Sequence, residues 1–171
     1  MSIEPKIYVA DLAAYNNGIL HGVWIDASED IETIQEQVSA MLAASPEDMA
    51  EEYAVHDYEG FGGLSISEYE GLESINQKAL FIEEFGELGA GVLDYLGDDL
   101  DEARKAMEEC YSGEYESLAD YARQLTEETG EIPEHLEFYI DYERMGRDME
   151  LSGDIYSIET GYRQVHVFWG C

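Results

Sequence analysis

The pattern of apolar and polar residues over the first sixty positions predicts a small sheet with one helix. Residues 7–10 and 19–25 are predicted strands. Asn16, Asn17 and Gly18 lie between them and favour a tight reversal, so we expect a β-hairpin. Residues 53–58 predict a third strand, with Tyr53, Val55 and Asp57 on one face.

A helix is predicted between the hairpin and the third strand. Ser28 offers an N-cap, and Ser45-Pro46 would end the helix. The apolar positions between them recur at helical spacing: Ile31, Ile34, Val38 and Met41.

The middle third is predicted to be helical. Residues 60–63 (GFGG) break the earlier pattern and mark a domain boundary. From about residue 67 to residue 110 the spacing is helical, with interruptions expected at Gly86, Gly89, Gly91 and Gly97. Ten apolar residues would form the core of a small helical bundle: Leu80, Phe81, Phe85, Leu88, Val92, Leu93, Leu96, Leu100, Ala103 and Met107.

The last third predicts two helices and a terminal hairpin. The helices cover residues 117–129, with Gly130 at the C′ position, and residues 133–150. The strands are residues 155–158 and 165–169, around Thr160-Gly161. We therefore expect an α+β protein, an elongated chain of three small domains. They are residues 1–60 (three-stranded sheet with helix), 61–110 (helical bundle) and 111–171 (mixed helix and β-hairpin).

Composition indicates a folded and very acidic chain. The 171 residues include 40 Asp+Glu against 8 Lys+Arg, which gives a formal net charge of −32. With 45% apolar and 12% aromatic residues, the chain can form a core, unlike a disordered acidic segment. Nucleic acid and anionic membranes are excluded as partners, because both attract positive surfaces.

Neither the N-terminal residues nor the two cysteines indicate a secreted protein. Cys110 and Cys171 are far apart and form no metal-binding motif, so neither a zinc site nor a disulfide scaffold is indicated. The N-terminal residues lack the basic start and apolar run of a signal peptide, and no apolar stretch approaches the roughly 20 residues of a membrane span. We expect a cytoplasmic protein.

Acidic pairs occur where helix stability disfavours them. Three predicted helices end in glutamate pairs, although negative charge at an exposed helix C-terminus costs about 0.3–1 kcal/mol per group. B-DNA carries about two phosphates per 3.4 Å, so about 32 charges match roughly 16 base pairs, or about 54 Å. A compact globule of this length is only about 40 Å across.

We therefore hypothesise that carboxylates imitate DNA phosphates and that the partner is a DNA-binding protein. The distributed target-binding candidates are Glu83, Glu84, Asp98, Asp99, Asp101, Glu102, Glu108, Glu109, Glu114, Glu116, Asp120, Glu127 and Glu128.

No pattern of residues supports an enzyme. The glycines at 60–63 lack the spacing and the lysine of a phosphate-binding loop. The acidic run at 98–102 does not fit a calcium-binding loop. His21, His56, His135 and His166 have no metal-ligand spacing, and no nucleophile motif occurs. We expect no catalytic residues, no metal and no cofactor.

Two other functional classes fit the charge. A protein adapted to high salt would also be acidic, but it should unfold in dilute buffer, whereas a mimic should stay folded. An acidic binder of basic proteins would sequester histone-like partners without discrimination.

Several stretches resemble the ArdA antirestriction proteins. They are IYVADL (residues 7–12), YNNG (15–18), GVW (22–24), EYAVHDYE (52–59) and, most specifically, LEFYIDYERMGRD (136–148), which is similar to the antirestriction segment of that family. The resemblance covers nearly the whole chain. In the middle third it lies in the general character of the sequence more than in matching residues.

The resemblance implies an inhibitor from mobile elements that acts on type I restriction–modification enzymes. Such proteins mimic bent B-form DNA, form homodimers and occupy the DNA groove of the methyltransferase core. The resemblance places Tyr139, Tyr142 and Met145 at a dimer contact; the alternative is that they form the core face of a helix. The implied contact set is Leu136, Tyr139, Ile140, Asp141, Tyr142, Met145, Gly146, Arg147 and Asp148.

Overall fold

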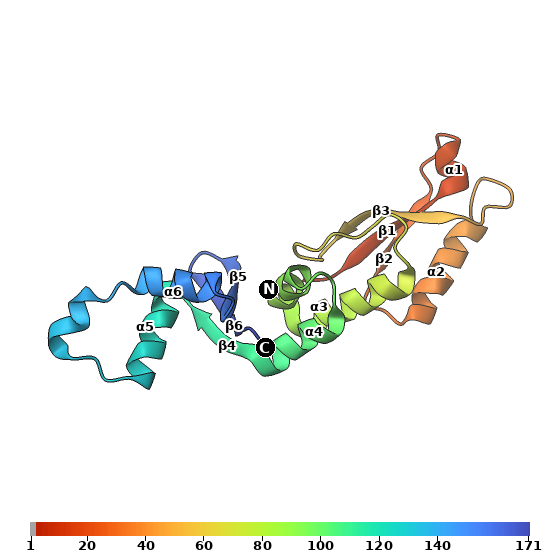
Figure 1. Ribbon diagram of the computed structural model, residues 1–171. Helices are drawn as coiled ribbons and strands as arrows, with labels where there is room; N and C mark the ends of the chain where they lie inside the picture. The colour runs from red at the N-terminus through yellow and green to blue at the C-terminus, as the bar shows by residue number, and fades with distance from the viewer. Residues whose placement is uncertain (1–2) are drawn as a thin grey trace. The chain divides into compact units, whose positions relative to one another are not determined.

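The computed structural model describes residues 3–171 and shows an α+β protein with two three-stranded antiparallel sheets (Figure 1). The chain forms two compact units, Met1–Ala90 and Gly91–Cys171, called here the first and the second unit. The predicted fold class is confirmed, and the division into three domains stays a prediction.

The first sheet has the order β2-β1-β3. Its strands are β1 (Lys6–Asp11), β2 (Gly22–Asp26) and β3 (Tyr53–Glu59). The predicted hairpin is present, because β1 and β2 pair antiparallel. Its connection contains a short helix, α1 (Leu12–Asn16). The second strand therefore begins at Gly22 and not at Ile19, whose amide donates to the carbonyl of Ala14 at 2.9 Å.

A β-bulge changes which side chains of β3 face the core. Tyr8 pairs with Asp57, whereas the next residue, Val9, pairs with Val55. The extra residue is His56, which lies between them, so Val55 and Asp57 do not keep the predicted alternation. Ala54 and Val55 pair in regular register with Ala10 and Val9, and all four residues are buried.

Helix α2 (Ile31–Ala43) packs beside this sheet, with Ile34, Val38 and Met41 buried. Its predicted end before Ser45-Pro46 is confirmed. The predicted N-cap at Ser28 is wrong: Asp30 occupies that position, and no side chain caps the helix. The Ser28 hydroxyl instead donates to the Asp26 carboxylate at 2.6 Å.

Helix α3 (Leu72–Tyr95) begins in the first unit and ends in the second. Only Gly86, with φ 69° and ψ −157°, has a non-helical conformation inside it. The predicted interruptions at Gly89 and Gly91 are wrong. The side-chain amide of Asn76 anchors α3 within the first unit, donating to the carbonyls of Ala27 at 2.8 Å and Glu29 at 2.7 Å.

Part of the glycine-rich segment at 60–63 packs into the first unit. Phe61 and Leu64 are only 1% and 2% exposed, and the Phe61 ring lies edge-on to Tyr58 with centroids 6.0 Å apart. Gly60 and Gly62 have positive φ values and permit the turns around these buried side chains. Two glycines thus serve local turns next to a buried phenylalanine.

The second sheet has the order β4-β6-β5. Its strands are β4 (Tyr111–Tyr115), β5 (Ile155–Gly161) and β6 (Gln164–Trp169). The predicted terminal hairpin is confirmed by the pairing of β5 with β6. Strand β4 was not predicted. It follows α4 (Leu100–Lys105) and a π-helical turn, η1 (Ala106–Cys110).

Two helices and a 3₁₀ turn complete the second unit. They are α5 (Leu118–Thr129), η2 (Glu134–Tyr139) and α6 (Tyr142–Leu151). The single helix predicted over 133–150 is wrong, because Ile140 is extended. Gly130 was predicted at the C′ position but is the C-cap residue of α5, with an extended backbone (φ −148°).

The core of the second unit forms between the sheet and these helices. Tyr121, Ile155, Val165 and Val167 are buried together. On the same sheet, the Tyr156 ring stacks between Tyr95 and Phe168, with centroids 4.4 Å and 5.1 Å away. This stack holds the last residue of α3 on the sheet.

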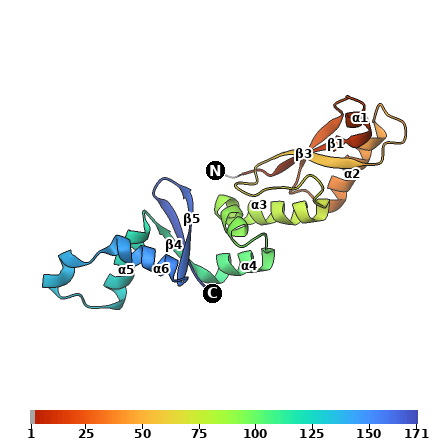
Figure 2. The same ribbon diagram turned by 45° about the horizontal axis from the view of Figure 1, so that its top comes forward.

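A disulfide joins Cys110 to Cys171 across a sequence separation of 61. The C-terminus accordingly lies beside the segment between α4 and β4 (Figures 1 and 2). The sequence did not indicate this pairing. Among residues 3–171, no helix has the length and apolar character needed to cross a membrane.

Candidate functional site

The predicted phosphate-mimicking carboxylates lie on the surface. All thirteen side chains are exposed except Asp120, which is half-buried. The exposed carboxylates Glu87 and Asp94 on α3 were not in the predicted set. The surface therefore carries more accessible negative charges than the thirteen predicted carboxylates.

The three glutamate pairs lie near a helix break or a helix end. Glu83 and Glu84 come just before the break at Gly86. Glu108 and Glu109 lie in the π-helical turn that ends in β4, and Glu127 and Glu128 are in the last turn of α5. No basic residue is present in the last turn of α5, whereas the last turn of α4, which leads directly into η1, contains Arg104 and Lys105. Exposed carboxylates thus accumulate where the helix dipole is also negative.

The acidic residues before and within α4 have a different local role. Asp99 is the N-cap of α4, and its carboxylate accepts a hydrogen bond from the Glu102 amide at 3.1 Å. Asp101 and Glu102 occupy the first turn of the helix, where negative charge is favourable. These carboxylates stabilise the helix start and are exposed at the same time.

Glu114 projects from β4 opposite His166 of β6. Tyr111 Oη and His166 Nδ1 are 2.6 Å apart, and Thr160 Oγ1 lies 3.0 Å from Nε2. Because Thr160 donates its own proton to Gln164 at 3.2 Å, it accepts from Nε2–H, and Tyr111 donates to Nδ1. Burial lowers the pKa of His166, while Glu114 opposes this shift. Burial therefore favours the neutral form of His166, which does not compensate the charge of Glu114.

The basic residues are too few to neutralise this surface. Most of them contact a carboxylate or an aromatic ring of the chain itself, and Lys78 is buried. The contacts are Lys6–Glu4 (3.8 Å), Lys78–Glu70 (3.1 Å), Arg104–Glu108 (3.4 Å), Arg144–Asp148 (4.0 Å), Arg123 over Tyr142 (5.5 Å) and Arg163 over Tyr162 (5.1 Å).

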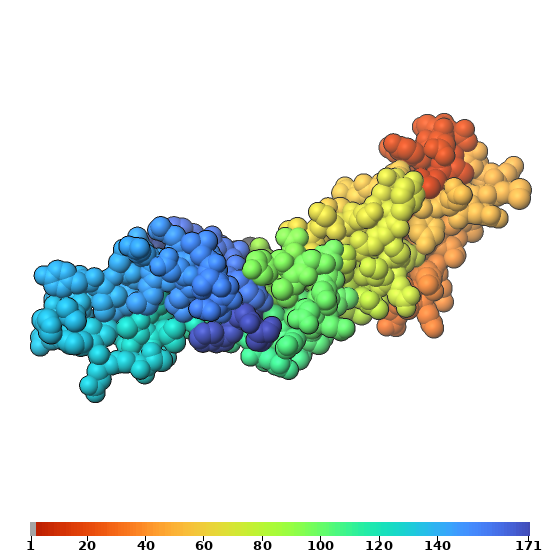
Figure 3. All heavy atoms as spheres, in the orientation of Figure 1, coloured from red at the N-terminus to blue at the C-terminus, as the bar shows by residue number. Residues whose placement is uncertain are grey.

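The 136–148 segment combines an exposed turn with a packed helix. Leu136, Phe138 and Tyr139 on η2 are 45%, 92% and 83% exposed. Residues 130–141, light blue in Figure 3, project from the second unit. Tyr139 therefore does not belong to a core face. Phe138, the most exposed of the three, was outside the predicted contact set, although it lies within residues 136–148.

Helix α6 is held against α5 by close packing. A Cβ on Gly146 would lie 2.8 Å from the carbonyl oxygen of Leu118, so only glycine permits this approach. The Thr126 hydroxyl, which donates to the Ala122 carbonyl at 2.7 Å, lies 3.4 Å from the sulfur of Met145, and Arg123 covers the ring of Tyr142. Met145 and Tyr142 are half-buried against α5.

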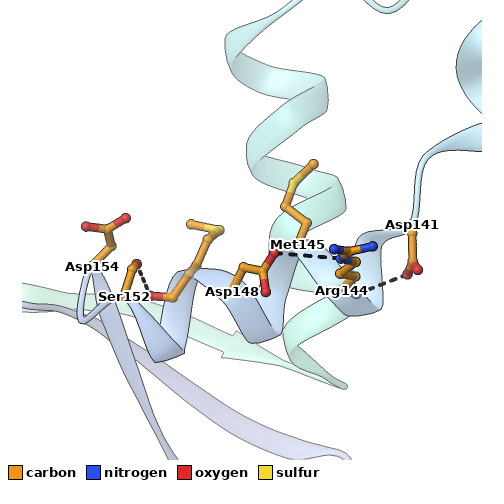
Figure 4. A pocket seen from close by; sticks show the side chains of 7 residues that line it. Asp141, Arg144, Met145, Asp148, Ser152 and Asp154 are labelled. Carbon is orange, nitrogen blue, oxygen red and sulfur yellow. Dashed lines mark hydrogen bonds and ion pairs between the residues drawn. The ribbon is translucent and has the colours of Figure 1, made fainter.

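A groove of about 530 Å³ runs along α6 (Figure 4). The Asp141 carboxylate caps the helix by accepting from the Arg144 amide at 3.0 Å, and the Arg144 side chain lies 4.0 Å from Asp148. Asp148 thus pairs with Arg144 one turn away and not with its neighbour Arg147. The groove is lined by Asp141, Arg144, Met145, Asp148, Met149, Ser152 and Asp154.

The contact set expected from the resemblance is thus divided between surface and packing positions. Exposed members are Leu136, Tyr139, Asp141, Arg147 and Asp148, half-buried members are Ile140, Tyr142 and Met145, and Gly146 is buried.

The described residues contain no group of three or more His, Cys, Asp or Glu side chains arranged to hold a metal ion. The model of one family, described as antirestriction protein (ArdA), matches residues 7–164 of the chain. No curated protein matches the chain.

Proposed function

The chain belongs to the ArdA antirestriction protein family, whose members act against type I restriction–modification systems; on this basis we propose that it inhibits these enzymes by mimicking B-form DNA. In this proposal, exposed carboxylates replace phosphates, and the protein occupies the DNA-binding groove of the methyltransferase core. It acts as a stoichiometric inhibitor in the cytoplasm, with no catalytic residue, cofactor or bound nucleic acid. Carriage on a mobile element is part of the same proposal.

The observation that carries the proposal is the large net negative charge of a chain whose candidate carboxylates are exposed. The formal net charge is −32, and the predicted phosphate mimics are exposed apart from half-buried Asp120. Glutamate pairs at helix C-terminal ends oppose local stability. A surface selected for stability alone would place lysine or arginine at these ends, so binding to a basic groove explains them better.

We also propose that the chain acts as a homodimer through the 136–148 segment. The support is the exposure of Phe138 (92%) and Tyr139 (83%) on η2. Exposed aromatic residues in a turn add nothing to the core of one chain, whereas aromatic side chains are enriched at interfaces. In the dimer, η2 would supply the contact, and α6 would support it through its packing on α5.

The proposed mechanism is tested by competition with DNA. A purified type I methyltransferase is bound to fluorescent target duplex, and the protein is titrated in at several salt concentrations. We expect displacement at near-stoichiometric concentrations in moderate salt. We also expect weaker binding as salt rises, because released counterions drive the association.

A matched control separates mimicry from general acidity. A disordered poly-glutamate of equal net charge should displace DNA only at much higher concentrations, since its charges have no fixed spacing. Persistence of the DNA complex in the presence of excess protein would refute the mimicry proposal. Equal potency of poly-glutamate would favour the unspecific acidic binder.

A further inference from the structure

The longest uncharged stretches of this acidic chain are residues 12–25 and 37–46. Because 28% of all residues are charged, the first stretch would be expected to contain about four charged side chains, and it has none. An uncharged surface of this kind cannot imitate phosphates. It therefore requires a separate explanation.

The fold brings these two stretches together at one end of the first unit. His21 Nε2 lies 2.8 Å from the carbonyl oxygen of Met41 near the end of α2. Figures 1 and 2 both show α1 and the loop after α2 side by side. Asp11, which precedes the first stretch, is fully buried and caps α1. We call residues 12–25 and 37–46 the uncharged end.

Apolar side chains protrude from the uncharged end on an ordered turn. Leu20 is 83% exposed, Tyr15 51% and Ile19 40%. The amides of Gly18 and Ile19 donate to the carbonyls of Tyr15 at 3.0 Å and Ala14 at 2.9 Å. The turn is therefore held by backbone hydrogen bonds while its apolar side chains face solvent.

Acidic residues border the uncharged end. The loop after α2 contains Glu47, Asp48, Glu51 and Glu52, and the Leu12 amide donates to the carbonyl of Glu52 at 3.1 Å. An apolar centre with a charged margin has the layout of a protein–protein interface. Its complement is an apolar surface bordered by lysine or arginine.

The possible occupants differ in how well they fit this layout. An anionic membrane surface would repel the acidic border. A second copy of the chain would bring like charges together. A protein surface with basic residues around an apolar patch meets neither obstacle.

We propose that the uncharged end docks on an apolar, lysine- or arginine-bordered protein surface of the target restriction–modification enzyme, outside its DNA-binding groove. This inference rests on the proposed function and adds a second contact to it. The carboxylates would occupy the phosphate-binding groove, and Leu20 would contact protein that DNA does not touch. Such a contact distinguishes the target from other DNA-binding proteins, which also attract negative charge.

The test compares Leu20→Ser with Leu20→Met, which keeps an apolar side chain, and with Leu151→Ser. Leu151 lies in the second unit and is 77% exposed, so its substitution is a control for loss of a surface leucine. Affinity for purified type I methyltransferase is measured without DNA over a range of salt concentrations. We expect Leu20→Ser to bind about tenfold more weakly, with an unchanged salt dependence, and the other two variants to bind like wild type.

The outcomes separate this inference from the proposed function. If wild type binds and displaces DNA but Leu20→Ser binds equally well, only the docking inference is overturned. The same conclusion follows if Leu151→Ser weakens binding as much as Leu20→Ser does. A changed sedimentation coefficient of Leu20→Ser alone, with unchanged affinity for the enzyme, would identify a second copy as the occupant. Failure of wild type to bind the enzyme would overturn both.

Discussion

Gly146 controls how closely α6 approaches α5. A methyl group at this position would meet the backbone carbonyl of Leu118 at 2.8 Å, and backbone atoms cannot rotate away as a side chain can. We expect Gly146→Ala to lower the free energy of unfolding by about 1–3 kcal/mol through overpacking, measured by urea denaturation. Gly130→Ala is the control, because its Cβ would be 3.7 Å from its nearest neighbour. Equal stability of the two variants would contradict this packing.

Asp11 stabilises the start of α1 from a buried position. Its carboxylate accepts from the amides of Ala13 at 3.0 Å and Ala14 at 3.3 Å. Asp11→Ala should lower the free energy of unfolding at pH 7 by about 1 kcal/mol, the usual effect of losing an N-cap. Asp11→Asn keeps a side-chain oxygen that can accept these hydrogen bonds but removes the negative charge. Comparison of the two variants therefore distinguishes the effect of the hydrogen bonds from the effect of the charge.

The pH dependence of this carboxylate follows from its environment. Burial raises the pKa of Asp11, but the nearby Ser45 side chain, the hydrogen bonds from the amides of Ala14 and Ala13 and the proximity of His21 outweigh it and lower the pKa below 3.8. The stabilisation is therefore present above the unfolded-state pKa and is lost as pH falls through the folded-state value. The stability difference between wild type and Asp11→Asn should shrink between pH 5 and pH 3. A constant difference would contradict a role for the charge.

At the scale of elements, the Cys110–Cys171 disulfide ties the end of β6 to the π-helical turn before β4. Closing a loop of 61 residues stabilises the folded state by about 2–4 kcal/mol in the chain-entropy description. We expect Cys171→Ser to lower the stability of the second unit by this amount in oxidising buffer. In excess dithiothreitol the two proteins should have the same stability, and a persisting difference would show another role for Cys171.

The η2 turn carries exposed aromatic residues that do not stabilise the single chain. Phe138→Ser should change the free energy of unfolding of the monomer by less than about 0.5 kcal/mol, as expected for surface substitutions. If the 136–148 segment forms the proposed dimer contact, this variant should sediment as a monomer at concentrations where wild type dimerises. If this variant lowers the stability of the monomer and leaves dimerisation unchanged, Phe138 stabilises the fold of the single chain instead.

At the scale of the whole molecule, we expect the acidic surface to lower the stability of the free protein and to strengthen its binding to the target enzyme. Glu127→Gln removes negative charge from the end of α5 and should raise the free energy of unfolding by about 0.3–1 kcal/mol. The same variant should bind the target enzyme only slightly more weakly, because a single exposed ion pair contributes little. Thermal denaturation and competition with DNA measure the two effects.

Combining substitutions extends this prediction. Replacing the pairs at 83–84, 108–109 and 127–128 together by glutamine should stabilise the free protein further while reducing inhibition strongly. Loss of all inhibition from any one of these changes would indicate a localised site. Retained inhibition by the combined variant would remove helix-end carboxylates from the proposed contact.

Local sequence patterns predicted much of the fold because the signals act over a few residues. The β1–β2 hairpin, the end of α2, the helix predicted over residues 117–129 and the β5–β6 hairpin follow from turn residues and short-range periodicity. Strand β4 was missed because its sequence YSGEY has little apolar character, and its strand structure depends on pairing with β6. The break at Ile140 was missed because no glycine or proline between residues 134 and 145 marks it.

By itself, the sequence determined the acidic charge, the local elements and the family resemblance, since these depend on residue identity and near neighbours. Tertiary structure decided which distant residues meet. It paired Cys110 with Cys171, buried Asp11 beside His21, exposed Phe138 and brought the stretches 12–25 and 37–46 together. The physical reason is that burial and long-range contacts arise only when separate elements pack, and periodicity along one element does not specify its packing partner.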